Sequence, residues 1–387
     1  MPYRVTSVAS IADIGTHVWD KLARSASVYS SGPWLRYVET HPDAQVSYLL
    51  ASDGDRVAAA LPVYCFQREV PLYYDPGFLF SDSGNGRSPG SVLVAGTREG
   101  YHSEVLIAES VPPPDRADIA AALVAELRRR SGGNGGTAAV LYLPDPDADL
   151  LASARESGDR LAVIDAQAVL DVPGDGLEAY LGGLSHNRRH MARREIRRFE
   201  KSGCGFRVGT LSECADRIGG LSAQLLNKYG HDADPEEESE RFGRQAGLID
   251  EISTVLCAYS GDTIVGFVHF IEWQDMLYAR AIGFDYSAAR TASLYFNLLY
   301  YKAVEYAAER GVKAIDYGCG SADTKVIRGA RLRPLWGLLL DAPAPDVGAA
   351  RERRELASFA ELDPAVVTGT VERLSPEMAR WAREAGK

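Results

Sequence analysis

Residues 293–336 read SLYFNLLYYKAVEYAAERGVKAIDYGCGSADTKVIRGARLRPLW, and this stretch organises the rest of the chain. A helix is predicted over its first part, from Ser293 as N-cap to Gly311 just past the last turn. Its apolar face is formed by residues at helical spacing: Phe296, Leu299, Tyr300, Ala303 and Ala307. Residues 312–317 read as a short buried strand, and the turn at 318–320 (Gly-Cys-Gly) lets backbone approach a ligand. Because α/β proteins keep their sites where strands end, we expect the site here, beside Lys325, Arg328, Arg331 and Arg333.

Length and composition predict two soluble globular domains. The chain has 387 residues, of which 46% are apolar and 25% charged. It holds no apolar run of about 18 residues, so no membrane span is expected, and its start shows no signal peptide. The five cysteines are scattered and form no C-x-x-C pair. They predict reduced thiols in a cytoplasmic protein and no structural zinc.

The second half predicts an α+β domain. Helices are expected over 177–184, 185–201, 211–229 and 240–249, with a short strand at 206–209 and an acidic loop, GHDADPEEESE, over 230–240. Three strands then form a meander over 253–259, 263–273 and 276–284, followed by the organising helix and a parallel strand.

The first half predicts a looser version of the same unit. Strands are expected over 46–51 and 56–65, joined by a hairpin turn, and over 138–143 and 161–170, with helices over 115–130 and 147–157. A further helix should begin at Ser31-Gly32-Pro33. The predicted domains are 1–170 and 171–345, with a helical tail over 346–387. Two copies of a similar unit are plausible, although no clean sequence repeat supports them.

Several segments of the sequence resemble the Fem-like and BioF2-like acyltransferases of the GNAT superfamily. The resemblance covers about residues 177–340. Residues 184–203 (LSHNRRHMARREIRRFEKSG) resemble the basic helix that opens the second domain of those enzymes, and residues 266–286 (GFVHFIEWQDMLYARAIGFDY) resemble their central hairpin. The signature positions are Tyr300, Tyr301, Glu305, Ala307, Gly311, Gly318, Gly320, Lys325, Arg328 and Gly329.

This resemblance implies two tandem GNAT-like domains, each with a mostly antiparallel sheet flanked by helices, and an enzyme that forms amide bonds. The acyl donor of such enzymes is an aminoacyl-tRNA or an acyl-coenzyme A, and the acceptor is a small amine of cell-wall or specialised-metabolite biosynthesis. In Fem-type enzymes a lysine after the last glycine turn helps to stabilise the reacting ester carbonyl, and Lys325 matches it.

One departure from the pattern bears on the donor. Coenzyme-A-dependent GNAT enzymes carry a Q/R-x-x-G-x-G/A turn, whose backbone N–H groups reach a pyrophosphate. Residues 290–295 read RTASLY and contain no glycine. This favours aminoacyl-tRNA as donor and no bound cofactor, with a coenzyme A thioester as the alternative. Tyr295, which ends this turn, is a candidate substrate-binding residue.

Aminolysis requires a neutral amine, a group that stabilises the oxyanion and a proton relay. Lys325 is the candidate for the oxyanion, and the alternative is a surface lysine that pairs with Asp323 or another neighbour. Asp316 with Tyr317 is the candidate for the relay. The alternative for Asp316 is an acid that caps the glycine turn or pairs with Arg328. Tyr278 and Arg280 share one face of a strand by alternation, which could line the cleft or be a polar outer face.

The remaining candidates are charged or polar surface positions. The net charge of −11 argues against general nucleic-acid binding, yet residues 186–201 carry a net charge of +5. Arg193 and Arg197 on this helix could contact a phosphate, or could be solvated and paired with the PEEESE run. Asp285 after the third meander strand and His231 in the acidic loop complete the substrate-binding candidates. For His231, an exposed loop position is the alternative.

Overall fold

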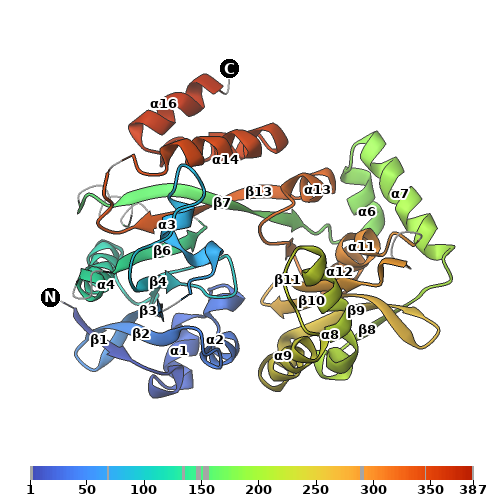
Figure 1. The fold of residues 1–387 in the computed structure, drawn as a ribbon, viewed down its shortest axis with the longest axis horizontal. Helices are drawn as coiled ribbons and strands as arrows, with labels where there is room; N and C mark the ends of the chain where they lie inside the picture. Colours follow the sequence, from blue (N-terminus) through green and yellow to red (C-terminus); the bar gives the residue numbers. More distant parts are fainter. Residues whose placement is uncertain are drawn as a thin grey trace. The chain divides into compact units, whose positions relative to one another are not determined.

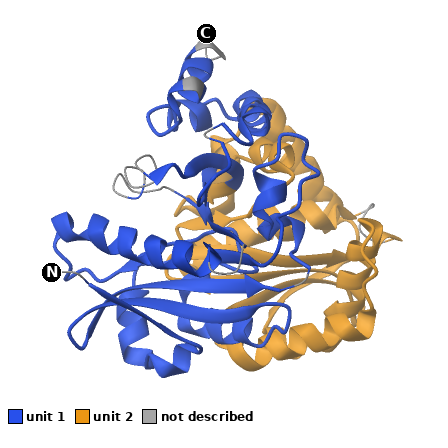
Figure 2. Ribbon diagram, turned by 60° about the vertical axis from the view of Figure 1, so that its left-hand side comes forward, with its two compact units in different colours: residues 1–167, 332–387 blue, residues 168–331 orange. Residues whose placement is uncertain are grey.

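The computed structural model describes residues 3–67, 69–132, 136–144, 150, 157–287, 292–344 and 346–385. The chain forms two compact units, residues 1–167 with 332–387 and residues 168–331 (Figure 2). It passes from unit 1 to unit 2 within strand β7 (Arg160–Asp171) and returns at the start of strand β13 (Arg331–Leu339). The C-terminal residues 332–387 belong to unit 1. Whether residues 1–170 and 171–345 fold as separate domains stays a prediction.

Unit 1 contains a mixed sheet with helices at its surface (Figure 1). Its strands follow the order β1-β2-β3-β4-β6-β13-β7, and β5 pairs with β3. Besides β7 and β13, the strands of this sheet are β1 (Arg4–Val8), β2 (Gln45–Asp53), β3 (Arg56–Phe66), β4 (Val92–Gly96), β5 (Leu106–Ile107) and β6 (Thr137–Leu143). The β2–β3 hairpin and strands β6 and β7 confirm the predictions for the first half.

The helices of unit 1 are α1 (Thr16–Leu22), α2 (Gly32–Glu39), α3 (Pro76–Leu79), α4 (Pro113–Gly132), α14 (Ala349–Leu362), α15 (Ala365–Thr368) and α16 (Pro376–Ala385). Short 3-10 turns cover Ile11–Asp13, Val28–Ser30 and Leu72–Tyr74. As predicted, α2 begins after Ser31, whose side chain accepts a hydrogen bond from the Trp34 amide. The helix expected over 147–157 falls almost entirely outside the described residues.

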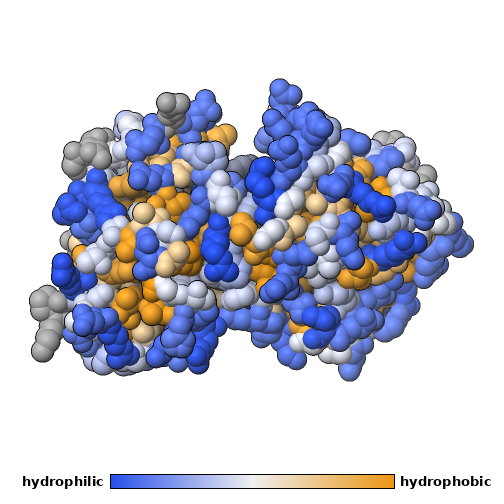
Figure 3. Space-filling model, turned by 90° about the horizontal axis from the view of Figure 1, so that it is seen from below, coloured by the Kyte–Doolittle hydropathy of each residue, from blue (hydrophilic) through white to orange (hydrophobic). Residues whose placement is uncertain are grey.

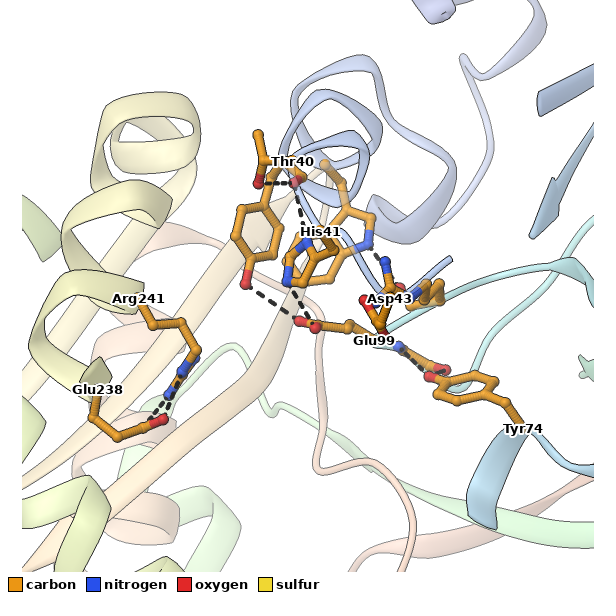
Figure 4. A network of polar contacts seen from close by, with 11 residues as sticks. Thr40, His41, Asp43, Tyr74, Glu99, Glu238 and Arg241 are labelled. Atoms are coloured by element: carbon orange, nitrogen blue, oxygen red, sulfur yellow. Dashed lines mark hydrogen bonds and ion pairs between the residues drawn. The ribbon is translucent and has the colours of Figure 1, made fainter. Parts of the chain in front are cut away.

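A polar network joins the end of α2 to the loop after β4 in unit 1 (Figure 4). His41 Nε2 lies 2.8 Å from Glu99 Oε1, and the Tyr37 hydroxyl donates to Glu99 Oε2 at 3.2 Å. The Thr40 hydroxyl donates to the Tyr37 carbonyl at 2.7 Å. These contacts satisfy the polar groups that follow the helix, where the last carbonyls lack intrahelical partners.

Unit 2 is built on the order β7-β12-β11-β10-β9-β8. The bounds are β8 (Gly205–Gly209), β9 (Ser253–Ser260), β10 (Thr263–Trp273), β11 (Met276–Phe284) and β12 (Ala314–Asp316). Strands β9, β10 and β11 are antiparallel neighbours, whereas β11 and β12 run parallel. The predicted meander and the parallel strand after it are confirmed, which confirms the mixed α/β fold class.

The helices of unit 2 are α6 (Gly176–Gly183), α7 (His186–Glu200), α8 (Leu211–Lys228), α9 (Pro235–Ile249), α11 (Leu294–Phe296), α12 (Lys302–Arg310) and α13 (Ala322–Ile327), with a 3-10 turn at Asp250–Ile252. Helices α8 and α9 cover the meander through buried Ile218, Phe242 and Phe267. The Phe242 and Phe267 rings meet edge to face, with centroids 5.7 Å apart. This packing holds the meander that carries the site.

The acidic run after α8 is the start of helix α9, so the prediction of a loop through residue 240 was wrong. Asp234 is the N-cap and accepts hydrogen bonds from the amides of Glu236 and Glu237, while Pro235 occupies the first turn. Glutamates in a first turn are stabilised by the positive end of the helix dipole. Glu238 forms an ion pair with Arg241 on the same helix at 2.6 Å (Figure 4).

The organising helix contains a π-helical turn that the sequence did not predict. Residues Asn297–Tyr301 form this turn between α11 and α12. Ser293 precedes α11 in the left-handed conformation, with φ at 53°, and makes no side-chain cap, so its predicted capping role was wrong. Gly311 ends the helix at φ 75°, as predicted. π turns often mark functional sites.

The surface of the protein is mixed in polarity. Figure 3 shows hydrophilic residues over much of the face that it presents, with hydrophobic residues exposed between them. Within the described ranges, no helix is both long and apolar enough to pass through a membrane.

Candidate active site

The site lies where the parallel strands β11 and β12 separate. They pair only through Met276–Ala314, Leu277–Ile315 and Tyr278–Asp316. Beyond these pairs, β11 continues to Phe284 and the other chain turns away at Tyr317. A cavity of about 590 Å³ opens between them. Its wall comes from β11, α8, α11 and the segment 317–325, all within unit 2, and this volume suits a small molecule.

A β-bulge opens the wall of the cavity. His269 pairs with Ala281 and Phe270 pairs with Ala279, which leaves Arg280 as the extra residue of β11. The bulge interrupts the alternation that would place Tyr278 and Arg280 on one face. Arg280 lines the cavity together with residues 279, 281 and 282, whereas Tyr278 is buried and does not. Of these two candidates, the structure therefore brings only Arg280 to the cavity.

Asp316 caps the glycine turn. Its side chain is buried, and Oδ1 accepts a hydrogen bond from the Gly318 amide at 2.7 Å. Gly318 and Gly320 have φ values of 66° and 74°, in the left-handed region that favours glycine. Asp316 therefore caps the glycine turn, which was the alternative prediction for this residue. Arg328 forms its ion pair with Glu195. Asp316 itself does not line the cavity.

Lys325 lies on α13, is 5% exposed, and lines the cavity. Its ammonium donates to the carbonyls of Tyr317, Gly318 and Cys319 at 2.7, 3.0 and 2.8 Å. Three such contacts use the donors of an ammonium group. In this conformation Lys325 therefore holds the glycine turn in place, and the oxyanion role predicted from the resemblance would require it to exchange a carbonyl for substrate.

We predict that Lys325→Met lowers the free energy of unfolding by about 3 kcal/mol or more, because hydrogen bonds to a charged group contribute about 1.5–3 kcal/mol each. Urea unfolding and turnover, measured on the same preparation, test this. A variant with unchanged stability and slower turnover would contradict the structural role and favour the oxyanion role. Lys228→Met, at an exposed aromatic contact, is the matched control for stability.

Tyr317 carries a buried hydroxyl that has no hydrogen-bond partner among the described residues. The residue is 5% exposed, lines the cavity, and its ring lies 4.9 Å from the Tyr300 ring. Burial, together with neighbouring tyrosine hydroxyls, raises the pKa of Tyr317 well above its usual value near 10. The hydroxyl is therefore a neutral donor near pH 7, and an unsatisfied buried donor costs free energy that a ligand could recover.

Aromatic and cationic side chains dominate the remaining wall. Tyr295 is half-buried and lines the cavity, and its ring meets Phe284 and Phe296 edge to face. Its substrate-binding role stays a prediction. Lys228, at the end of α8, places its ammonium 4.3 Å from the centre of the Tyr286 ring. The sequence did not single out Lys228, because its position opposite β11 depends on how α8 packs.

A buried ion pair anchors the basic helix α7 to the cavity wall. Glu195 accepts hydrogen bonds from Arg328 Nη2 at 2.9 and 3.2 Å and from the Tyr301 hydroxyl. Arg328 also stacks 3.6 Å from the centre of the Phe296 ring, and Phe296 lines the cavity. Sequence reasoning missed Glu195, which looked like one of two acids on a basic surface helix.

The exposed face of α7 is strongly basic. Arg189 binds the backbone of the preceding segment, where it donates to the carbonyls of Leu181, Gly182 and Leu184. Arg193 forms an exposed ion pair with Glu178 at 3.2 Å, so the alternative that this face pairs with the PEEESE run is not what the structure shows. Arg188 is half-buried and donates to the Val326 carbonyl at 3.2 Å. The other three arginines are exposed and have no ion-pair partner in the described part of the chain: Arg194, Arg197 and Arg198.

Two sequence candidates lie away from the cavity wall. The side chain of Asp285 accepts hydrogen bonds from the amide and hydroxyl of Ser287 at 2.8 and 2.6 Å, which caps the turn after β11. His231 is exposed in the loop after α8, as its alternative reading predicted. Neither residue lines the cavity.

The turn expected to hold a coenzyme A pyrophosphate is only partly described, since Arg290 and Thr291 lie outside the described residues. Ser293 adopts the left-handed conformation where a glycine would be unstrained. The coenzyme A alternative therefore stays a prediction. In the described ranges, no group of three or more His, Cys, Asp or Glu side chains could hold a metal ion.

Comparison with known proteins supports the fold. No curated protein matches the sequence significantly. A solved FemX structure is similar over 86% of this chain and 96% of its own, with 9% identity and a TM-score of 0.58. The C-terminal domain of a putative lysylphosphatidylglycerol synthetase from Agrobacterium fabrum is similar over 87% of this chain and 94% of its own, with 14% identity and a TM-score of 0.52. A tandem GNAT protein from the clavulanic acid biosynthesis pathway is similar over 88% of this chain and 99% of its own, with 12% identity and a TM-score of 0.51.

The sequence profile described as "Acetyltransferase (GNAT) domain" matches residues 186–326. This range includes the basic helix α7, the meander, the π turn and most of the cavity wall. Unit 2 therefore carries a GNAT acetyltransferase domain, and the chain is an acyltransferase of GNAT fold.

Proposed function

We propose that this acyltransferase forms an amide bond between an aminoacyl group carried by tRNA and a small amine. The observation that carries the proposal is the cavity at the fork of β11 and β12, which is lined by Tyr317. The buried hydroxyl of Tyr317 has no hydrogen-bond partner among the described residues. Arg194, Arg197 and Arg198 on the exposed face of α7 support the tRNA donor, because they have no ion-pair partner among the described residues and a phosphate backbone attracts clustered cations.

In this reaction the amine nitrogen attacks the ester carbonyl carbon. A C–N bond forms, the ester C–O bond breaks, and the terminal ribose oxygen leaves with a proton while the amine loses one. Tyr317, a neutral phenol near pH 7 that burial keeps protonated, donates the proton to the leaving oxygen and recovers one from the attacking amine through water. The ammonium of Lys325 holds the 317–319 backbone, from which the Tyr317 side chain projects.

The buried Glu195–Arg328 pair gives the basic face a fixed position. Because Arg328 neutralises Glu195 in the interior, the exposed surface of α7 is more positive than its sequence implies. The same pair reaches Phe296 on the cavity wall. A tRNA acceptor end bound along α7 would thus sit on a helix rigidly joined to the site.

The test is incubation of the full chain with charged tRNA and a panel of amines, with and without prior ribonuclease treatment. Amide product that disappears after ribonuclease supports the proposal, and product that survives contradicts a tRNA donor. The second candidate donor is an acyl-coenzyme A, favoured by the GNAT domain match. Tight binding of coenzyme A in calorimetry would support that candidate.

We predict that Arg197→Gln with Arg198→Gln weakens tRNA binding and lowers the slope of log affinity against log salt by about 1–2, since each neutralised phosphate contributes about 0.9. Arg207→Gln is the matched control, because Arg207 is exposed on β8 and stacks on Tyr259 away from α7. Equal salt slopes in the double variant and the parent would argue against a phosphate-binding role.

A further inference from the structure

The charged side chains of the described cavity wall are all positive. Among its described lining residues, Lys228, Arg280 and Lys325 are cationic and none is a carboxylate. The ammonium of Lys325 is engaged by three backbone carbonyls. Lys228 and Arg280 are the other two cations of the described wall. The carboxylate of Asp316, closest in the chain to Tyr317, is turned to the Gly318 amide.

The two cations come from different elements. Lys228 ends α8 and stacks on Tyr286, and Arg280 occupies the bulge of β11. His269, which pairs beside the bulge, is 1% exposed. Burial, together with the nearby positive charges of Arg280 and Arg241, lowers the pKa of His269 to about 3, so its imidazole adds no charge to this region near pH 7.

The proposed donor does not account for these cations. The phosphates of a tRNA backbone are matched by the exposed arginines of α7. A coenzyme A pyrophosphate would bind backbone N–H groups at the start of α11, which Ser293 precedes in the left-handed conformation. The aromatic residues beside Lys228 and Arg280 offer an apolar surface for a small molecule: Tyr229, Phe284, Tyr286, Tyr295 and Phe296.

We propose that the cavity binds an acceptor amine that also carries a carboxylate, as an amino acid does, with Arg280 and Lys228 holding the carboxylate. This inference rests on the amide-forming function proposed above. A guanidinium on a strand bulge can bind a carboxylate through two parallel hydrogen bonds. The same positive wall disfavours the ammonium form of the acceptor, which keeps the attacking nitrogen neutral.

The test is calorimetric titration of the full chain with matched ligand pairs that differ only in the carboxylate: tyrosine and tyramine, phenylalanine and phenethylamine, and leucine and isopentylamine. We expect the amino acid to bind about tenfold or more tightly than its amine in at least one pair, which corresponds to about 1.4 kcal/mol. Arg280→Met should bring this ratio close to one, and Lys228→Met should reduce it.

Arg207→Met is the control variant, because it removes one exposed cation outside the cavity and should leave the ratio unchanged. The proposal is overturned if no amino acid binds better than its amine, or if Arg280→Met preserves the ratio. A parallel pair, 4′-phosphopantetheine and pantetheine, tests the other source of an anion. A phosphate preference that depends on Arg280, without a carboxylate preference, would assign the cations to the donor and overturn the acceptor assignment. The titration uses no charged tRNA. It therefore tests the acceptor assignment even if tRNA is not the donor.

Discussion

Replacing Tyr317 with phenylalanine should slow amide formation by about a hundredfold or more while leaving the protein at least as stable as the parent. A positioned proton donor contributes about 10²–10⁴ in rate. The hydroxyl has no partner among the described residues, so its removal takes away an unsatisfied buried group that costs about 1–3 kcal/mol. The measurements are the single-turnover rate and the urea midpoint on the same preparations.

Tyr180→Phe is the matched control for this experiment. Tyr180 is also buried, but its hydroxyl donates to the Arg328 carbonyl at 2.8 Å and the residue does not line the cavity. We expect this variant to lose about 1 kcal/mol of stability and to keep its rate. A Tyr317→Phe enzyme that keeps the parental rate would remove Tyr317 from the mechanism, whatever its stability.

The second large effect concerns the buried ion pair. Glu195→Ala should lower the free energy of unfolding by about 3–5 kcal/mol, because it leaves the Arg328 charge in the interior without its partner. The side chains of Arg328 and Glu195 are 5% and 7% exposed, and the Tyr301 hydroxyl also depends on Glu195. Denaturant unfolding monitored by tryptophan fluorescence measures the change.

Arg193→Ala provides the comparison, since it breaks the exposed pair with Glu178, in which the side chains are 51% and 78% exposed. Exposed pairs contribute about 0–1 kcal/mol, so this variant should be nearly as stable as the parent. The double change Glu195→Gln with Arg328→Met should recover part of the lost stability, because it removes both buried charges. Similar losses for Glu195→Ala and Arg193→Ala would show that burial of the pair has little effect.

The meander shows why much of the fold could be predicted. Strands β10 and β11 have the bounds expected from the sequence, since alternating apolar residues and the polar turns between them are local signals. Gly311 ended its helix as expected for the same reason. Helix α9 was misread because the acidic PEEESE run looks like a solvated loop until Asp234 is recognised as its N-cap.

The candidate site was predicted only in part. Tyr317, Lys325, Tyr295 and Arg280 line the cavity, but Tyr278, Asp285 and His231 do not. The bulge that turns Arg280 into the wall is a mismatch between two strands, and no single strand's sequence reveals it. The roles of all these residues remain predictions for the variants described above.

By itself the sequence determined the strand order of the meander, the helix and glycine turn that follow it, and the concentration of cations on α7, since these depend on neighbours along the chain. Only the tertiary structure decided that Glu195 pairs with Arg328, that Lys325 binds three carbonyls, and that the Tyr317 hydroxyl finds no hydrogen-bond partner among the described residues. The physical reason is that burial, and therefore the cost of an unpaired charge or donor, is set by residues far apart in the chain.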